Sequence, residues 1–245
     1  MPLFLVPKPG QEGQWKCIAD GKAGGQNIVC VNDPMHLLQP TDILPWLYPG
    51  GFSAIIDASK YFHMFKTKPD EWKYLGVVHP KTGKFYIYTT LPMGSRNSPA
   101  AACRFGSGFL REVTRTHPSF QGTLRLNDFT QTLLGEKIDS SLGSGRVEVG
   151  RDGLGKNLLF MHIDDVFLHS HTYAKTAEGL THVINTALCL GLICQPVKTQ
   201  PHWQWQKYCS FIYDTHNIPT MHIPQAKHTC ACPMQAVASV CNFYL

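Results

Sequence analysis

Short apolar runs of strand length, separated by turns rich in Pro, Gly and Asn, fill the first part of the chain. They predict strands at residues 3–6, 15–19, 52–56, 74–78 and 84–89. The turn between the first two runs contains Pro, Gly and Lys and predicts a long hairpin, and the turn sequence at 80–83 predicts another. A short helix is expected at 41–47, with Thr41 as its N-cap.

Helical periodicity appears at two places further along the chain. Ser98 is expected to cap a helix that has Pro99 at its first position. Apolar residues then recur at near-helical spacing, at Ala102, Phe105, Phe109, Leu110 and Val113. A second, amphipathic helix is predicted at about 172–190. The Gly- and Ser-rich stretch 130–156 between them has little periodicity and predicts a loop or a mobile hairpin.

The apolar runs 158–163 and 166–168 flank the pair Asp164 and Asp165. This pattern predicts a strand, an acidic turn and a second strand. With the earlier elements, it gives the order strand, helix, strand hairpin, helix. Such an order is typical of an α+β domain with an antiparallel sheet and helices on one face.

Composition limits the possible functions only loosely. The 245 residues include 43% hydrophobic residues, enough for a packed core, and the net charge of +5 is compatible with an anionic partner such as nucleic acid. Nine cysteines, an odd number without a C-x-x-C pair, indicate reduced thiols, and the first residues lack the pattern of a signal peptide. No apolar run is long enough to span a bilayer. We therefore expect an intracellular protein without a membrane anchor.

Carboxylates at the ends of apolar runs are the main candidates for chemistry. Asp57 closes one buried strand, and Asp164 and Asp165 follow another, so neighbouring strands could bring the three together. Hard anionic oxygens are what two Mg²⁺ ions require for in-line phosphoryl transfer, in polymerases and in nucleases. An Asp-Asp pair alone is more often an ordinary hairpin turn. No zinc site is assigned to His228, Cys230 and Cys232, because the spacing is poor and no second pair completes it.

The segments around these acids resemble the motifs of retroviral and long-terminal-repeat retrotransposon reverse transcriptases, in the right order. Residues 5–8 and 15–22 resemble the basic fingers hairpin, and residues 55–63 (IIDASKYFH) resemble the first palm motif. Residues 91–99 (LPMGSRNSP) resemble the second palm motif and residues 161–165 (MHIDD) the third. Gly191, Leu192, Lys198 and the segment 207–214 are similar to the last two palm motifs. Each motif is modest alone, but the ordered set is a strong signal.

The resemblance implies the right-hand polymerase fold, with fingers and palm, an antiparallel palm sheet with helices on one face, and a thumb that is largely absent. The implied boundaries are fingers at 1–50 and 66–90, palm at 51–65 and 91–213 with a loop insertion near 130–156, and a truncated start of the thumb at 214–245.

The resemblance also implies roles for individual residues at a two-metal centre. Asp57 and Asp164 would be the main ligands of two Mg²⁺ ions, with Mn²⁺ as a substitute, and the backbone carbonyl of Ala58 would add another oxygen. Asp165 would complete the acidic cluster. The three aspartates would be the catalytic residues.

The remaining implied roles concern the incoming nucleotide. Lys8 and Lys16 would neutralise its triphosphate, and Lys198 would approach its phosphates late in catalysis. Phe62 would lie beneath the sugar and leave no room for a 2′-hydroxyl, and Gly94 would let the backbone approach the template base pair. The alternatives are solvated surface charge for the lysines and core packing for Phe62.

Three positions depart from the family pattern. Met93 stands where glutamine is common, His162 where tyrosine or phenylalanine is common, and Cys209 with Ser210 where a Leu-Gly pair is frequent. None of these removes a metal ligand. They make the efficiency and fidelity of polymerisation and the grip on the primer harder to infer from the family. His162, for example, would lie beside the primer end and could change charge near neutral pH.

The resulting hypothesis is an RNA-directed DNA polymerase from a retrotransposon-like element. It would extend a primer on an RNA or DNA template with deoxynucleoside triphosphates, in the cytoplasm, the nucleus or a retroelement particle. One alternative is a truncated, inactive remnant with at most nucleic-acid binding. Another is a two-metal nuclease with the same acids, which would leave the fingers lysines and Phe62 without a task.

Overall fold

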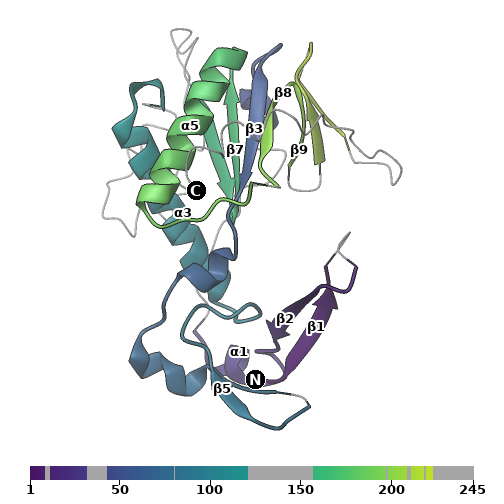
Figure 1. Cartoon of the computed structure of the whole chain (residues 1–245), viewed down its shortest axis with the longest axis vertical. Helices are drawn as coiled ribbons and strands as arrows, with labels where there is room; N and C mark the ends of the chain where they lie inside the picture. Colours follow the sequence, from purple (N-terminus) through teal and green to yellow (C-terminus); the bar gives the residue numbers. More distant parts are fainter. Residues whose placement is uncertain are drawn as a thin grey trace. The chain divides into compact units, whose positions relative to one another are not determined.

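The structure is a computed structural model of the chain, and it describes residues 1–8, 12–31, 43–79, 81–120, 157–196, 198–208, 211–217 and 219–222. The chain forms two compact units. The first comprises Met1–Met35 and Lys60–Phe105, and the second comprises His36–Ser59 and Gly106–Leu245. Both contain helical segments and antiparallel strand pairs, so the expected α+β class is confirmed. Figure 1 labels the main elements.

Two hairpins supply the strands of the first unit. β1 (Leu3–Pro7) pairs with β2 (Trp15–Ala19), which confirms the predicted first hairpin. β4 (Gly76–Val78) pairs with β5 (Phe85–Ile87), and both strands are shorter than expected. Residues 69–74 form the 3-10 helix η3 (Pro69–Tyr74), so the predicted strand at 74–78 began too early. The ring of Pro69 fixes φ at a helical value in the first turn of η3.

An aromatic cluster holds together the middle of the first unit. The 3-10 helix η2 (Tyr61–Met64) buries Tyr61, whose hydroxyl donates to the carbonyl of Ala102 over 3.0 Å. The ring of Phe65 packs on Tyr61 at 4.8 Å and on Phe105 at 4.6 Å between centroids. Packing the buried Tyr61 against two partly buried rings, with its hydroxyl satisfied, anchors η2 to the following long helix.

That long helix, α3 (Ser98–Thr116), confirms the predicted periodicity but corrects its cap. The amide of Ala101 donates to the carbonyl of Asn97, so Asn97 occupies the N-cap position and Ser98 is already helical. The Ser98 hydroxyl is buried and makes no hydrogen bond within the part of the chain that the structure describes. The prediction placed the cap one residue too late.

A four-stranded sheet forms the centre of the second unit. Its order is β6 (Leu158–His162), β7 (Asp165–Ser170), β3 (Phe52–Asp57) and β8 (Gln200–Trp203), with antiparallel neighbours. The predicted strands 52–56, 158–163 and 166–168 are thus confirmed in type. β3 and β7 are buried along most of their length, which explains their continuous apolar runs.

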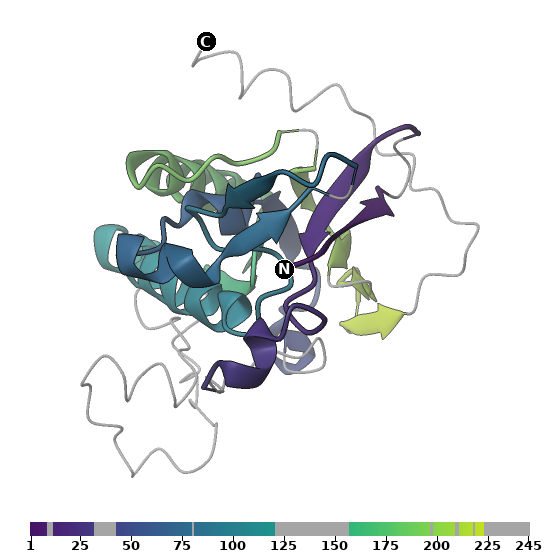
Figure 2. The same cartoon turned by 90° about the horizontal axis from the view of Figure 1, so that it is seen from below.

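Helices cover one face of this sheet. α5 (Tyr173–Cys189) confirms the predicted second helix, and Thr172 caps it by accepting a hydrogen bond from the amide of Lys175. The hydroxyl of Thr176 ties α5 to the carbonyl of Phe52 in β3. His182 of α5 contacts the carbonyl of Val113 in α3. Figures 1 and 2 show α5 and the C-terminal part of α3 side by side.

The other face packs against a three-stranded sheet in the order β11 (Thr220–His222), β10 (Phe211–Asp214) and β9 (Trp205–Tyr208). The short helix expected at 41–47 is a 3-10 helix, η1 (Leu44–Trp46), with Pro45 in its first turn. The residues on both sides of η1 join the same core. Thr41, the expected cap, lies outside the described residues. The core residues are Ile43, Leu47, Ile55, Leu158, Phe160, Phe167, Tyr208 and Tyr213. The remaining described elements are α1 (Gln26–Val29) and η4 (Pro118–Phe120).

A buried histidine ties β3 and β7 together at the end remote from the aspartates. His169 accepts a hydrogen bond from the amide of Tyr48 at Nε2, over 2.8 Å, so its Nδ1 proton is available to the Ser53 hydroxyl at 2.8 Å. Burial, and then the charge of His171, lowers the pKa of His169 to about 3. The ring is therefore neutral near pH 7 and acts as a structural cross-strand link.

Several expectations lie outside the described residues: the loop insertion at 130–156, the segment 223–245 of the expected thumb, and the His228 to Cys232 cluster. The thiols of Cys17, Cys30 and Cys189 are free. Within the described ranges, no helix is long and apolar enough to cross a membrane.

Gly51 provides a test of the histidine link. A Cβ at Gly51 would lie 2.5 Å from Cε1 of His169 and 2.8 Å from the carbonyl oxygen of Ser170, so Gly51→Ala must displace the ring or the strand. We expect a loss of about 1–3 kcal/mol in the free energy of unfolding, measured with urea. Gly108→Ala is the matched control, because nothing lies within 4 Å of its Cβ position in α3. It should stabilise by about 0.5–1 kcal/mol. Equal effects of both substitutions would contradict this account.

Candidate active site

The register of β3 and β7 places two of the predicted carboxylates directly opposite each other. Asp57 is the last residue of β3, and it pairs with Asp165, the first residue of β7. His162 of β6 pairs with Asp165 on its other side, so Ile163 and Asp164 form a two-residue turn. The predicted acidic turn is confirmed, but only Asp164 lies in it. The structure thus gathers all three aspartates at one end of the sheet.

The turn that carries Asp164 has a strained backbone. Ile163 has a φ of 56°, in the left-handed region that β-branched residues rarely adopt. Such a conformation costs about 1–3 kcal/mol and persists only where the surroundings impose it. One contact that holds the turn in this conformation is the hydrogen bond from the amide of Ala58 to the carbonyl of Asp164, 3.0 Å long. Nothing in the sequence pointed to Ile163, because its residue type carries no signal for this conformation.

Asp165 is an acid whose charged form the site disfavours. Burial is the largest cause, the charges of Asp164 and Asp57 add to it, and together they raise its pKa from 3.8 to about 7. A hydrogen bond with the side chain of Asp57 also raises this pKa, whereas Lys198 lowers it. Near neutral pH the site therefore carries more negative charge than its environment readily accommodates, and a cation would relieve it.

Lys198 provides one such cation. Its Nζ lies 3.0 Å from Oδ2 of Asp57, and the side chain of Asp57 is only 13% exposed. Backbone bonds place this segment beside β3: the amide of Gln195 donates to the carbonyl of Asp57, and the amide of Lys198 donates to the carbonyl of Gln195. A lysine expected to approach nucleotide phosphates thus contacts an expected metal ligand.

The donor set suits a hard cation. Within the described residues, no group of three or more His, Cys, Asp or Glu side chains is arranged to hold a metal ion as it stands. Mg²⁺ does not need such a cage, because it usually takes one or two carboxylates and completes its shell with water and substrate phosphates. Asp57 and Asp165 face each other with an excess of negative charge. The backbone amides of Ser59 and Gln195 donate the two hydrogen bonds of the β-bridge between residues 58 and 194. The carbonyl oxygen of Ala58 takes part in neither of these two bonds.

Tyr208 supports the site from the opposite sheet and was not identified as a site residue from the sequence. Its buried hydroxyl donates to the carbonyl of Asp165 over 3.0 Å. Its ring packs on Phe167 of the same strand at 5.0 Å between centroids. The sequence of β9, WQKY, does not alternate apolar and polar residues, and the bond to Asp165 depends on a contact between distant segments.

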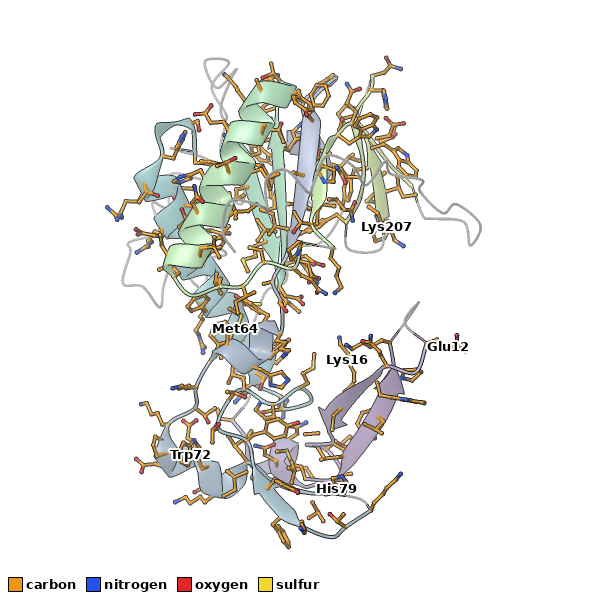
Figure 3. The ribbon with its side chains drawn as sticks, in the orientation of Figure 1. Glu12, Lys16, Met64, Trp72, His79 and Lys207 are labelled. Atoms are coloured by element: carbon orange, nitrogen blue, oxygen red, sulfur yellow. The ribbon has the colours of Figure 1, made fainter. Side chains whose placement is uncertain are left out.

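The lysines of the first hairpin lie in the other compact unit. Lys16 is exposed on β2 (Figure 3). It pairs with Val6, and the amide of Lys8 donates to the carbonyl of Gln14 just beyond the last strand pair. Because side chains alternate along strands, Lys8 and Lys16 share one face of the hairpin. The Nζ of Lys8 also donates to Oε1 of Gln14, 3.1 Å away.

Phe62 and Gly94 also belong to the first unit. Phe62 is partly buried in η2, where its ring meets Tyr61 edge-on at 6.3 Å between centroids. Gly94 is exposed with a φ of 99°, and a Cβ there would lie 1.9 Å from the carbonyl oxygen of Ala19. Only glycine fits this position. The expected role of Gly94 at a base pair stays a prediction.

Neither a protein-family model nor a curated protein matches the sequence. Solved structures do match the fold. The foamy viral protease-reverse transcriptase dRH in complex with double-stranded DNA matches 87% of this chain, with a TM-score of 0.62 and 19% identity. The foamy viral protease-reverse transcriptase in complex with an RNA/DNA hybrid matches 91%, with a TM-score of 0.61 and 17% identity. Its complex with double-stranded DNA also matches 91%, with a TM-score of 0.60 and 18% identity.

The chain has a reverse-transcriptase fold. The likeness confirms the predicted resemblance at the level of fold, since the identities are low. The chain spans 29%, 23% and 36% of the lengths of those three chains. In this reverse-transcriptase fold, the three aspartates and Lys198 lie together in the second unit, and Lys8, Lys16, Phe62 and Gly94 lie in the first.

The acidic cluster predicts a dependence of stability on pH. The pKa of Asp165 is higher in the folded protein than in the unfolded chain, so its contribution is fully present below about pH 3.8 and is lost as the pH rises through about 7. In metal-free buffer, Asp165→Asn should remove this loss and raise the melting temperature at pH 8 relative to the unsubstituted protein. Thermal unfolding across pH 4–8 measures it.

Asp70→Asn is the control, because Asp70 is an exposed acid in η3. It should leave the pH profile unchanged. Adding Mg²⁺ at pH 8 should raise the melting temperature of the unsubstituted protein more than that of Asp165→Asn. An identical pH profile for Asp165→Asn and the unsubstituted protein would refute the raised pKa.

Proposed function

We propose that this chain contains the fingers and palm of a reverse transcriptase, an RNA-directed DNA polymerase, from a retrotransposon-like element. The observation that carries the proposal is the pairing of Asp57 with Asp165 beside the strained turn of Asp164, within a reverse-transcriptase fold. The fingers would be 1–50 and 66–90, and the palm would be 51–65 and 91–213. The substrates would be a primer on an RNA or DNA template and deoxynucleoside triphosphates.

Asp57, Asp164 and the carbonyl of Ala58 would hold two Mg²⁺ ions, and Asp165 would complete the negative cluster. When bound, the ions activate the primer 3′-hydroxyl and stabilise charge on the transferred phosphate. The protein contributes rigidity, because the buried strands β3 and β7 hold Asp57 and Asp165 and the amide of Ala58 holds the turn. Burial disfavours the charged form of Asp165, so a bound cation would stabilise this arrangement of charges.

The lysines would act on the nucleotide phosphates. Lys198 contacts Asp57 in the absence of substrate, and its flexible stem would let the ammonium turn to a phosphate oxygen once cations neutralise Asp57. Lys8 and Lys16, on one face of the first hairpin, would neutralise the triphosphate. Phe62 would lie beneath the sugar and exclude a 2′-hydroxyl.

Primer extension tests the activity. With oligo(dT) on poly(rA) and Mg²⁺ or Mn²⁺, the chain should extend the primer, and Asp164→Asn should reduce the rate at least about a hundredfold. The expected loss reflects several kcal/mol of charge stabilisation at the transition state. Asp70→Asn is the isosteric control and should retain the rate, because Asp70 is an exposed acid of η3 in the first unit.

The same assay separates the competing functions. Template degradation that requires Asp164 would favour a two-metal nuclease. Binding of the primer-template without extension would favour an inactive remnant. Extension that survives Asp164→Asn would show that another site carries the activity, and it would overturn the residue assignment.

The sugar-gate role of Phe62 can fail independently. Phe62→Ala should raise the ratio of ribonucleotide to deoxynucleotide incorporation at least about tenfold, because room for the 2′-hydroxyl would open. Phe65→Ala is the matched aromatic control: its ring packs on Tyr61 and Phe105, so its loss should lower stability without changing that ratio. A ratio unchanged in Phe62→Ala, in an active enzyme, would assign Phe62 to packing alone.

A further inference from the structure

Asn27 lies in the short helix α1 and in none of the segments that resemble reverse-transcriptase motifs. Its backbone amide donates to the carbonyl of Gly21 over 2.8 Å, which fixes it just after β2. Its side chain is directed at the segment around Gly94, which is far away in sequence. Asn27 therefore connects two segments that the chain order does not bring together.

Both the nitrogen and the oxygen of the Asn27 side-chain amide form hydrogen bonds with this segment. Its Nδ2 donates to the carbonyl of Gly94 over 3.1 Å, and its Oδ1 accepts from the amide of Arg96 over 2.8 Å. The backbone carbonyl of Asn27 accepts a third bond, from Nη1 of Arg96 at 3.3 Å. Because a backbone N–H can only donate, the orientation of the amide group is determined. The side chain spans the residues on both sides of Ser95.

The surrounding backbone is packed closely enough to leave this loop little freedom. A Cβ on Gly21 would lie 2.7 Å from Oδ1 of Asn27 and 2.9 Å from the carbonyl oxygen of Gly94. The amide of Ala19 donates to the carbonyl of Met93 over 2.9 Å. Just beyond the loop, Nδ2 of Asn97 donates to the carbonyl of Val31 over 2.9 Å. The loop is thus bonded before, at and after Gly94.

We propose that Asn27 is a positioning residue for nucleotide binding: it sets the backbone of residues 93–97, so that the exposed Gly94 meets the nascent base pair without a cost of ordering the loop. This inference rests on the proposed polymerase function. Asn27 touches no reacting atom. Without Asn27 the loop would sample other conformations. The binding free energy of each nucleotide would then include the cost of ordering the loop.

Steady-state primer extension with Asn27→Ala tests the proposal. The KM for the deoxynucleotide should rise about three- to tenfold, since one or two neutral hydrogen bonds are lost, while kcat stays within about threefold. Asn27→Asp keeps the acceptor for Arg96 but turns an oxygen toward the carbonyl of Gly94. It should raise KM at least as much as Asn27→Ala.

Ile28→Ala is the matched control, because Ile28 is the next residue of α1 and its side chain is 77% exposed. It should leave KM and kcat unchanged. A merely structural role for Asn27 would lower the unfolding transition and kcat without a selective rise in KM, and that result would overturn the proposal. So would an unchanged KM in both Asn27 variants.

Hydrogen exchange of the 91–97 segment separates this inference from the polymerase proposal. Asn27→Ala should speed amide exchange in that segment, and Ile28→Ala should not. If the unsubstituted chain extends no primer but the exchange differs as expected, the polymerase proposal fails while the loop contact stands. If exchange is unchanged in Asn27→Ala, Asn27 does not order the loop, whatever the activity.

Discussion

The antiparallel pairing of β3 with β7 is the interaction on which the candidate site depends. It is buried between helices on one face and a second sheet on the other, so neither strand can shift without exposing apolar side chains on both faces. The same register that fills the core with Ile55 and Phe167 sets Asp57 opposite Asp165. Packing and the placement of the carboxylates are therefore one constraint, and the acids inherit their positions from the hydrophobic core.

Placing these carboxylates close together has an electrostatic cost, which the rest of the fold offsets only in part. Burial and neighbouring charges hold the proton on Asp165, and Lys198 offsets some of the negative charge by its contact with Asp57. A protein evolved only for stability would dispense with such a cluster. The strained Ile163 lies beside the same acids. Strain and excess charge at one end of a well-packed sheet are typical of a site organised for chemistry.

The sequence predicted the elements whose signals are local. Apolar runs predicted β1, β2 and β3, and the amphipathic pattern at about 172–190 predicted α5. Errors arose where distant contacts decide. Asn97 rather than Ser98 caps α3, and the four-residue strands β9 and β10 pair with each other while β9 lies against the distant β3. The aspartates could be named from ordered motifs, but the ion pair of Asp57 with Lys198, 141 residues apart, could not.

The histidine link at the far end of the strands limits how this protein can change in length. The pair of Ser53 with His169 and the pair of Asp57 with Asp165 lie four positions apart on each strand, with three residues between them. Since side chains alternate, one inserted or deleted residue in either stretch would send a carboxylate to the helix-covered face. Over these two stretches, substitutions that preserve volume can accumulate, whereas the count of codons between the histidine and the acid has to stay fixed.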